Sequence, residues 1–129
     1  MPRAQEMRDR MTAYLEAVAR QDVEAVVALF ADSISVEDPV GGPPGTHVVG
    51  REAVRAFFEA GFATSRPRPR REGAIVTTAG NEAAMAFTLF LELAGKPTEI
   101  DVIDVMAFDD DHRITSLRAF WNFREARDA

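Results

Sequence analysis

Asp104 occupies a position where the alternation of side chains predicts only apolar residues. Between 98 and 108 the chain reads TEIDVIDVMAF. Strand side chains alternate between two faces, so Asp104 has only apolar neighbours on its own face. An ionised carboxylate there would lose hydration without a cationic partner, so we expect a raised pKa and a neutral hydrogen-bond donor. The alternative is an edge strand with that face partly hydrated. The two expected faces are Ile100, Val102, Asp104, Met106 and Phe108, and Glu99, Asp101, Ile103, Val105 and Ala107.

A second carboxylate and a phenol also fall in apolar patterns. Asp38 shares a face with Ile34 and Val36 in the strand-like segment 33–38, and the following proline favours an extended conformation. Tyr14 falls in the apolar stripe of a helix expected over 4–20. Taken singly, Tyr14 could be a core tyrosine with a satisfied hydroxyl, and Asp38 a turn-starting residue.

Together, the three groups suit removal of a proton next to a carbonyl. A carboxylate in a dry pocket is a stronger base than one in water. A phenol and a neutral carboxylic acid can each donate a hydrogen bond to an oxygen that acquires charge. This chemistry requires that all three side chains face the same protein interior.

The elements that must position these groups are helices first and strands last. A short helix is expected to begin at Asp22, a good N-cap residue. The links between the later strands are short and rich in turn-forming residues, which indicates an antiparallel meander. We therefore expect one α+β domain, 1–129, whose helices cover a curved sheet and leave a cleft. The expected helices are 4–20, a segment from 22, and 50–62; the loop is 39–45; the strands are 33–38, 73–78, 83–93, 98–108 and 113–123.

Composition excludes several classes of function. The 129 residues match the size of one domain, and no apolar run approaches the roughly 20 residues that span a membrane. A net charge of -6 argues against general binding to nucleic acid or anionic lipid. There is no cysteine and no hydrophobic signal core, which is compatible with the cytoplasm.

Other motifs carry little chemistry. The segment 66–71, RPRPRR, is expected to be a solvated loop, although a polyanion patch is the alternative. The acidic run 109–111 lacks the spacing of an EF-hand. His47 and His112 lie far apart, without a second histidine or cysteine nearby. We expect neither a metal nor a cofactor.

Several stretches resemble bacterial ketosteroid isomerase, in order and over nearly the full chain. They are Tyr14 with its spacing, LFADSISVEDPVGGPP at 29–44, NEAAMAFT at 81–88 and DVIDVMAFDDDHRI at 101–114. This family belongs to the nuclear transport factor 2-like superfamily, whose members are generally dimeric. The resemblance implies a cone-shaped fold, with three helices packed on a curved antiparallel sheet around an apolar pocket, and a homodimer.

The resemblance also implies a role for each polar residue. Asp38 would move a proton from carbon 4 to carbon 6 of a 3-oxo-Δ5-steroid, giving the conjugated Δ4 isomer, while Tyr14 and Asp104 hold the dienolate oxygen. Many family members carry a further tyrosine where this chain has Phe58, and Tyr14 is the only tyrosine here. The positions matching the family's steroid pocket are Phe57, Phe58, Phe87, Val102, Leu117 and Trp121.

Two other classes of function remain open. The protein could bind an apolar ligand without catalysis, or be a polyketide cyclase or epoxide hydrolase of the same superfamily. Such enzymes often use histidine or arginine beside the carboxylate, and neither histidine is expected to face the pocket. Asp101 faces away from Asp104 and is expected to be dispensable. The outer residues Ile103, Val105 and Ala107 suit either a subunit interface or core beneath another element.

Overall fold

Helices and strands follow each other in the expected order in a computed structural model, which describes residues 2–129. The helices are α1 (Ala4–Ala19), α2 (Val23–Val27) and α3 (Arg51–Ser65), with a short 3-10 helix η1 (Phe123–Glu125). The strands are β1 (Phe30–Glu37), β2 (His47–Val49), β3 (Arg68–Thr77), β4 (Glu82–Leu93), β5 (Lys96–Phe108), β6 (Ile114–Phe120) and β7 (Arg127–Asp128).

Local chemistry explains where the helices begin and end. The Asp22 carboxylate accepts a hydrogen bond from the backbone N–H of Ala25 at 3.0 Å, which caps α2 as expected. Gly50 precedes α3 with φ of 91°, a conformation that favours glycine. Arg66 ends α3 in the left-handed conformation, so the chain turns sharply there towards β3.

The seven strands form one curved, open sheet in the order β2-β1-β6-β5-β4-β3, with β7 added beside β5. Strands β3 to β6 form the expected antiparallel meander. However, β1 pairs with β6 in parallel, so the sheet is mixed rather than wholly antiparallel. Because β1 and β6 are far apart in sequence, the turn signals that predict hairpins could not reveal this pairing.

The segment 66–71 is not the solvated loop that we expected. Residues from Arg68 onwards belong to β3, where Pro69 pairs with Leu89 of β4. Proline is compatible with this strand because β3 lies at the edge of the sheet, where a missing N–H breaks no second ladder. The arginines are exposed to solvent as expected, although from Arg68 onwards the backbone is a strand rather than a loop.

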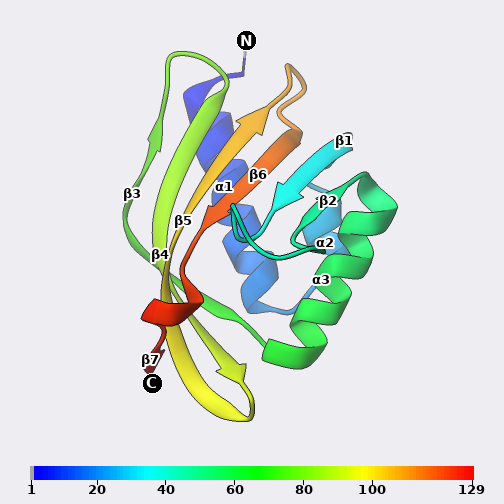
Figure 1. Ribbon diagram of the computed structural model, residues 1–129. Coiled ribbons are helices and arrows are strands. Elements are labelled where there is room, and N and C mark those ends of the chain that lie inside the picture. Colours follow the sequence, from blue (N-terminus) through cyan, green and yellow to red (C-terminus); the bar gives the residue numbers. More distant parts are fainter. Residues whose placement is uncertain (1) are drawn as a thin grey trace.

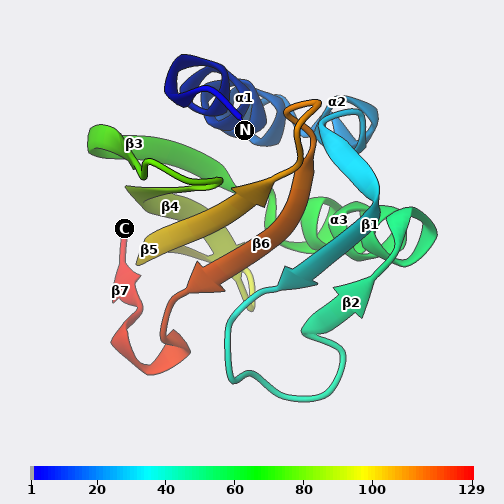
Figure 2. The same cartoon turned by 90° about the horizontal axis from the view of Figure 1, so that it is seen from above.

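Helices α1 to α3 cover one face of the sheet and the core lies between them (Figures 1 and 2). The alternation predicted for β5 is confirmed, because Ile100, Val102, Asp104, Met106 and Phe108 are all buried. Asp104 pairs with Met85 of β4 and Ala119 of β6, so it lies inside the sheet and the edge-strand alternative is wrong. In residues 2–129, no helix is long and apolar enough to cross a membrane.

Candidate active site

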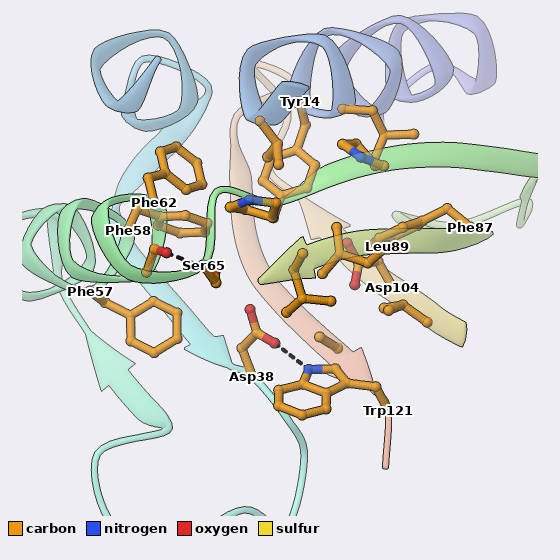
Figure 3. Close-up of a pocket in the computed structure, with 18 residues that line it drawn as sticks. Tyr14, Asp38, Phe57, Phe58, Phe62, Ser65, Phe87, Leu89, Asp104 and Trp121 are labelled. Carbon is orange, nitrogen blue, oxygen red and sulfur yellow. Dashed lines mark hydrogen bonds between the residues drawn. The ribbon is translucent and has the colours of Figure 1, made fainter. Parts of the chain in front are cut away.

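An apolar cavity lies between α3, α1 and the sheet (Figure 3). The cavity volume is about 190 Å³, and the cavity is open to solvent on one side. Tyr14, Asp38 and Asp104 all line it, so the fold brings together the three groups predicted from different parts of the chain. The other lining residues are Leu15, Val18, Phe57, Phe58, Gly61, Phe62, Ser65, Pro67, Pro69, Phe87, Leu89, Leu91, Val102, Ala119 and Trp121.

Asp104 projects into this cavity from the middle of β5 and is 2% exposed. Burial, and then the neighbouring charge of Asp38, raise the pKa of Asp104 well above its usual value. Its carboxyl group has no hydrogen-bond partner among residues 2–129. Burial therefore favours the neutral form of Asp104, in which a carboxyl group can donate a hydrogen bond to whatever occupies the cavity.

Tyr14 projects from the buried side of α1. Its ring contacts Phe30 and packs edge-on against Phe58, with centroids 6.4 and 6.3 Å away. Burial, together with the charges of Asp104 and Asp38, raises the pKa of Tyr14 well above its usual value. In the described part of the chain, its hydroxyl has no hydrogen-bond partner. Phe58 thus contacts the Tyr14 ring by packing alone.

Asp38 lies directly after β1 and faces the same cavity. Its Oδ1 accepts a hydrogen bond from Trp121 Nε1 at 2.6 Å (Figure 3). Burial raises the pKa of Asp38 from 3.8 to about 6, while the bond from Trp121 acts in the opposite direction. Burial therefore raises the pKa of both carboxylates, and only Asp38 receives a hydrogen bond that favours its charged form. A base and two donors of this kind can share one substrate.

Five of the six residues predicted to contact a ligand line the cavity: Phe57, Phe58, Phe87, Val102 and Trp121. Leu117 is the exception, because it is fully buried in the hydrophobic core and does not line the cavity. Ala119, two residues further along β6, lines the cavity instead. Sequence reasoning gave Leu117 the correct face of β6 but could not give its depth.

Other lining residues were missed. Ser65 and Pro67 come from the end of α3 and the following connection, and Leu91 from the end of β4. The parity of β4 offered a signal for Leu91, which shares a face with Phe87. No sequence signal marked Ser65 and Pro67, because their place depends on the turn at Arg66.

The two histidines lie outside the cavity lining. His47 is on β2, with Nε2 hydrogen-bonded to Ser35 at 3.0 Å, and His112 is in the turn before β6. Within residues 2–129, no three His, Asp or Glu side chains are grouped so that they could hold a metal ion.

Known proteins share this fold and part of this sequence. Residues 11–117 match the SnoaL-like domain family. The chain is 34% identical over 116 residues to the Steroid Delta-isomerase of Nocardioides simplex, covering 90% of this chain and 89% of that protein.

Solved structures of other proteins have the same fold as this chain. The epoxide hydrolase/cyclase-like enzyme SalBIII, from pyran ring formation in polyether salinomycin, matches with a TM-score of 0.88 and 23% identity over 100% of both chains. A Mycobacterium tuberculosis protein in complex with estradiol-17beta-hemisuccinate matches with a TM-score of 0.85 and 25% identity over 95% of this chain and 98% of that one. The chain therefore belongs to the SnoaL-like family of the nuclear transport factor 2-like superfamily and is a relative of steroid delta-isomerase.

Proposed function

We propose that this protein is a steroid delta-isomerase, which converts 3-oxo-Δ5-steroids into 3-oxo-Δ4-steroids without a cofactor. The observation that carries this proposal is the pairing, in one apolar cavity, of an ionisable Asp38 with two unpartnered donors, Tyr14 and Asp104. The 34% identity to a steroid delta-isomerase supports it. A relative bound to estradiol-17beta-hemisuccinate supports a steroid as the ligand.

In the proposed reaction, ionised Asp38 removes a proton from carbon 4 of the steroid. The C–H electrons then form a dienolate, and negative charge gathers on the oxygen at carbon 3. Tyr14 and Asp104 donate hydrogen bonds to that oxygen, in a cavity where such bonds are stronger than in water. Asp38 returns the proton to carbon 6, so the double bond moves into conjugation and the enzyme is regenerated.

The different environments of the two carboxylates explain how they divide these roles. Asp104 has no donor that would stabilise its charged form, so burial keeps it protonated. Asp38 receives the Trp121 N–H, which favours the charged form, and its pKa stays near 6. At neutral pH, therefore, the site carries one negative charge, on the group that must accept a proton.

The cavity walls suit a flat hydrocarbon. Phe57 and Phe87 contribute rings, and Val102 and Leu89 contribute branched side chains along the sheet. Burial of such a substrate stabilises the complex by roughly 25 cal/mol for each Å² of apolar surface removed from water. The few polar groups then determine its orientation.

The direct test is incubation with 5-androstene-3,17-dione, with the ultraviolet absorbance of the conjugated enone as the readout. The expected result is steady enone formation by the unaltered protein and near loss of it in Asp38→Asn, which keeps the volume but removes the base. Turnover no faster than in Asp38→Asn would contradict the proposal. A simple epoxide, assayed for diol formation, tests the epoxide hydrolase alternative, and binding without turnover of either compound would indicate a binding protein.

We also propose that the protein is a homodimer. Ile103 of β5 and Phe120 of β6 are register partners on the face away from the helices, 49% and 41% exposed. Association of two chains through this face would remove these adjacent apolar side chains from water. Analytical ultracentrifugation should give twice the chain mass, and Ile103→Lys should shift the protein towards monomer. A monomer at all concentrations would contradict this assembly.

A further inference from the structure

A second cavity adjoins the apolar one at the end remote from Asp104. Three segments of the chain contribute lining residues to both cavities. Leu91 of β4 lines both cavities. At the end of α1, Val18 lines the first and Ala19 the second. At the end of α3, Ser65 lines the first and Arg66 the second. In Figure 1 the end of α3 lies near the β4–β5 hairpin, and the shared residue Leu91 belongs to that hairpin, so the two cavities border each other there.

The second cavity has a different chemistry, because two arginines border it. Neither Arg66 nor Arg68 forms an ion pair within residues 2–129, in a chain whose net charge is -6. Gln21, which also borders it, donates a hydrogen bond from Nε2 to the carbonyl of Pro67 at 2.6 Å. That bond ties Pro67, which lies between the two arginines, to the segment that follows α1.

The spacing along β5 relates this cavity to the proposed reaction. Thr98 borders the second cavity and Asp104 the first, six residues later on the same strand. At about 3.3 Å per residue, the two positions are roughly 20 Å apart. A steroid with its oxygen at Asp104 would fill the apolar part with its four fused rings. Only a side chain on the far ring would reach the arginines.

We propose that the second cavity is a subsite for a carboxylate on the far-ring side chain of the substrate, with Arg66 and Arg68 as its ligands. The guanidinium group presents donors in a planar fork that matches a carboxylate. The inference rests on the proposed function for the direction in which the steroid lies. Glu92 also borders the cavity and opposes an anion there, so its removal should strengthen binding.

The test compares 3-oxochol-4-en-24-oic acid with its methyl ester, which has the same rings and no charge. Trp121 is the only tryptophan and lines the apolar cavity, so quenching of its fluorescence measures the Kd of each compound without turnover. We expect the acid to bind more tightly than the ester. In Arg66→Gln/Arg68→Gln, this preference should fall by roughly tenfold, as loss of charge-assisted hydrogen bonds implies. In Glu92→Gln it should rise.

Arg8→Gln is the control, because Arg8 is an arginine on α1 that borders neither cavity. Its ratio of acid to ester affinity should match that of the unaltered protein. Equal affinity for the two compounds, or the same preference in the double variant, would overturn the subsite. Failure to isomerise 5-androstene-3,17-dione with the acid preference intact would remove the isomerase function and leave the subsite standing.

Discussion

At the scale of single residues, Asp38 and Asp104 show how one side-chain type can take two roles. Both are buried, and burial raises both pKa values. Only Asp38 receives a donor, the indole N–H of Trp121. The Trp121 bond lowers the pKa of Asp38, whereas the neighbouring charge of Asp38 raises the pKa of Asp104 further.

The first prediction concerns the pH dependence of turnover. The pKa of Asp38 is raised to about 6, so the base is ionised above that pH and protonated below it. We expect kcat/KM for 5-androstene-3,17-dione to be flat above about pH 7 and to fall roughly tenfold per pH unit below pH 5. A profile without an acid limb between pH 5 and 7 would show that Asp38 is not the base.

The second prediction tests whether Asp104 acts as a hydrogen-bond donor. Asp104→Asn keeps a donor in place, whereas Asp104→Leu removes it. Loss of one oxyanion donor costs about a hundredfold to a thousandfold in kcat, so we expect that loss in Asp104→Leu and a smaller one in Asp104→Asn.

Asp101→Asn is the matched control, because Asp101 lies on the same strand, faces outwards and is paired with Arg127. It should stay within about twofold of the unaltered enzyme. The reverse order of the two Asp104 variants would exclude the donor role.

At the scale of elements, the site depends on the parallel pairing of β1 and β6. Residues 36 and 117 are register partners, and the pairing places the ends of both strands together. The backbone N–H of Val40 donates to the carbonyl of Ala119 at 2.9 Å, which extends the link beyond β1. Asp38 and Trp121 meet because of this arrangement, although 83 positions separate them in sequence.

The third prediction tests that contact. Trp121→Phe keeps an aromatic ring in the wall but removes the N–H that lowers the pKa of Asp38. The acid limb of kcat/KM should therefore move above pH 6, by up to about one pH unit for the loss of one hydrogen bond. At pH values well above the acid limb, kcat/KM of Trp121→Phe should fall less, relative to the unaltered protein, than it does at pH 6. An unchanged midpoint would mean that the indole does not tune the base.

Much of the site could be predicted because it follows from local periodicity. The alternation of β5 is a property of any strand, and it correctly put Asp104 inside and Asp101 outside. Helical spacing likewise put Tyr14 in the core. These positions needed no knowledge of which elements become neighbours.

What could not be predicted depends on contacts between distant segments. The bond between Trp121 and Asp38 requires the parallel β1–β6 pairing, which no turn signal announces. The strand at Arg68 requires β4 as a partner, because prolines and arginines alone favour a loop. Leu117 has the right face but lies too deep, since depth depends on how the helices close over the sheet.

At the scale of the whole molecule, a buried base should cost stability. The folded-state pKa of Asp38 lies above its unfolded value of 3.8, so stability is highest when the group is protonated and falls as pH rises through about 6. At neutral pH the cost is about 3 kcal/mol, from the size of the pKa change.

The fourth prediction is that the variant that loses activity, Asp38→Asn, gains stability. Asp38→Asn should raise the free energy of unfolding by up to about 3 kcal/mol at pH 7.5, and by about half as much at pH 5. Urea unfolding at both pH values measures this difference. A gain that is equal at pH 5 and pH 7.5 would show that the benefit does not come from removing a buried charge.

The central claim is that Tyr14 and Asp104 hold one oxygen of the substrate while Asp38 faces the adjacent carbon. A crystal structure with a bound phenolic steroid tests it most directly, because the phenol imitates the dienolate. We predict that its oxygen lies within hydrogen-bond distance of both Tyr14 Oη and an Asp104 carboxyl oxygen, with the ring edge towards Asp38. A phenol oxygen bonded to Asp38 or Trp121 instead, or one that meets neither donor, would contradict this account.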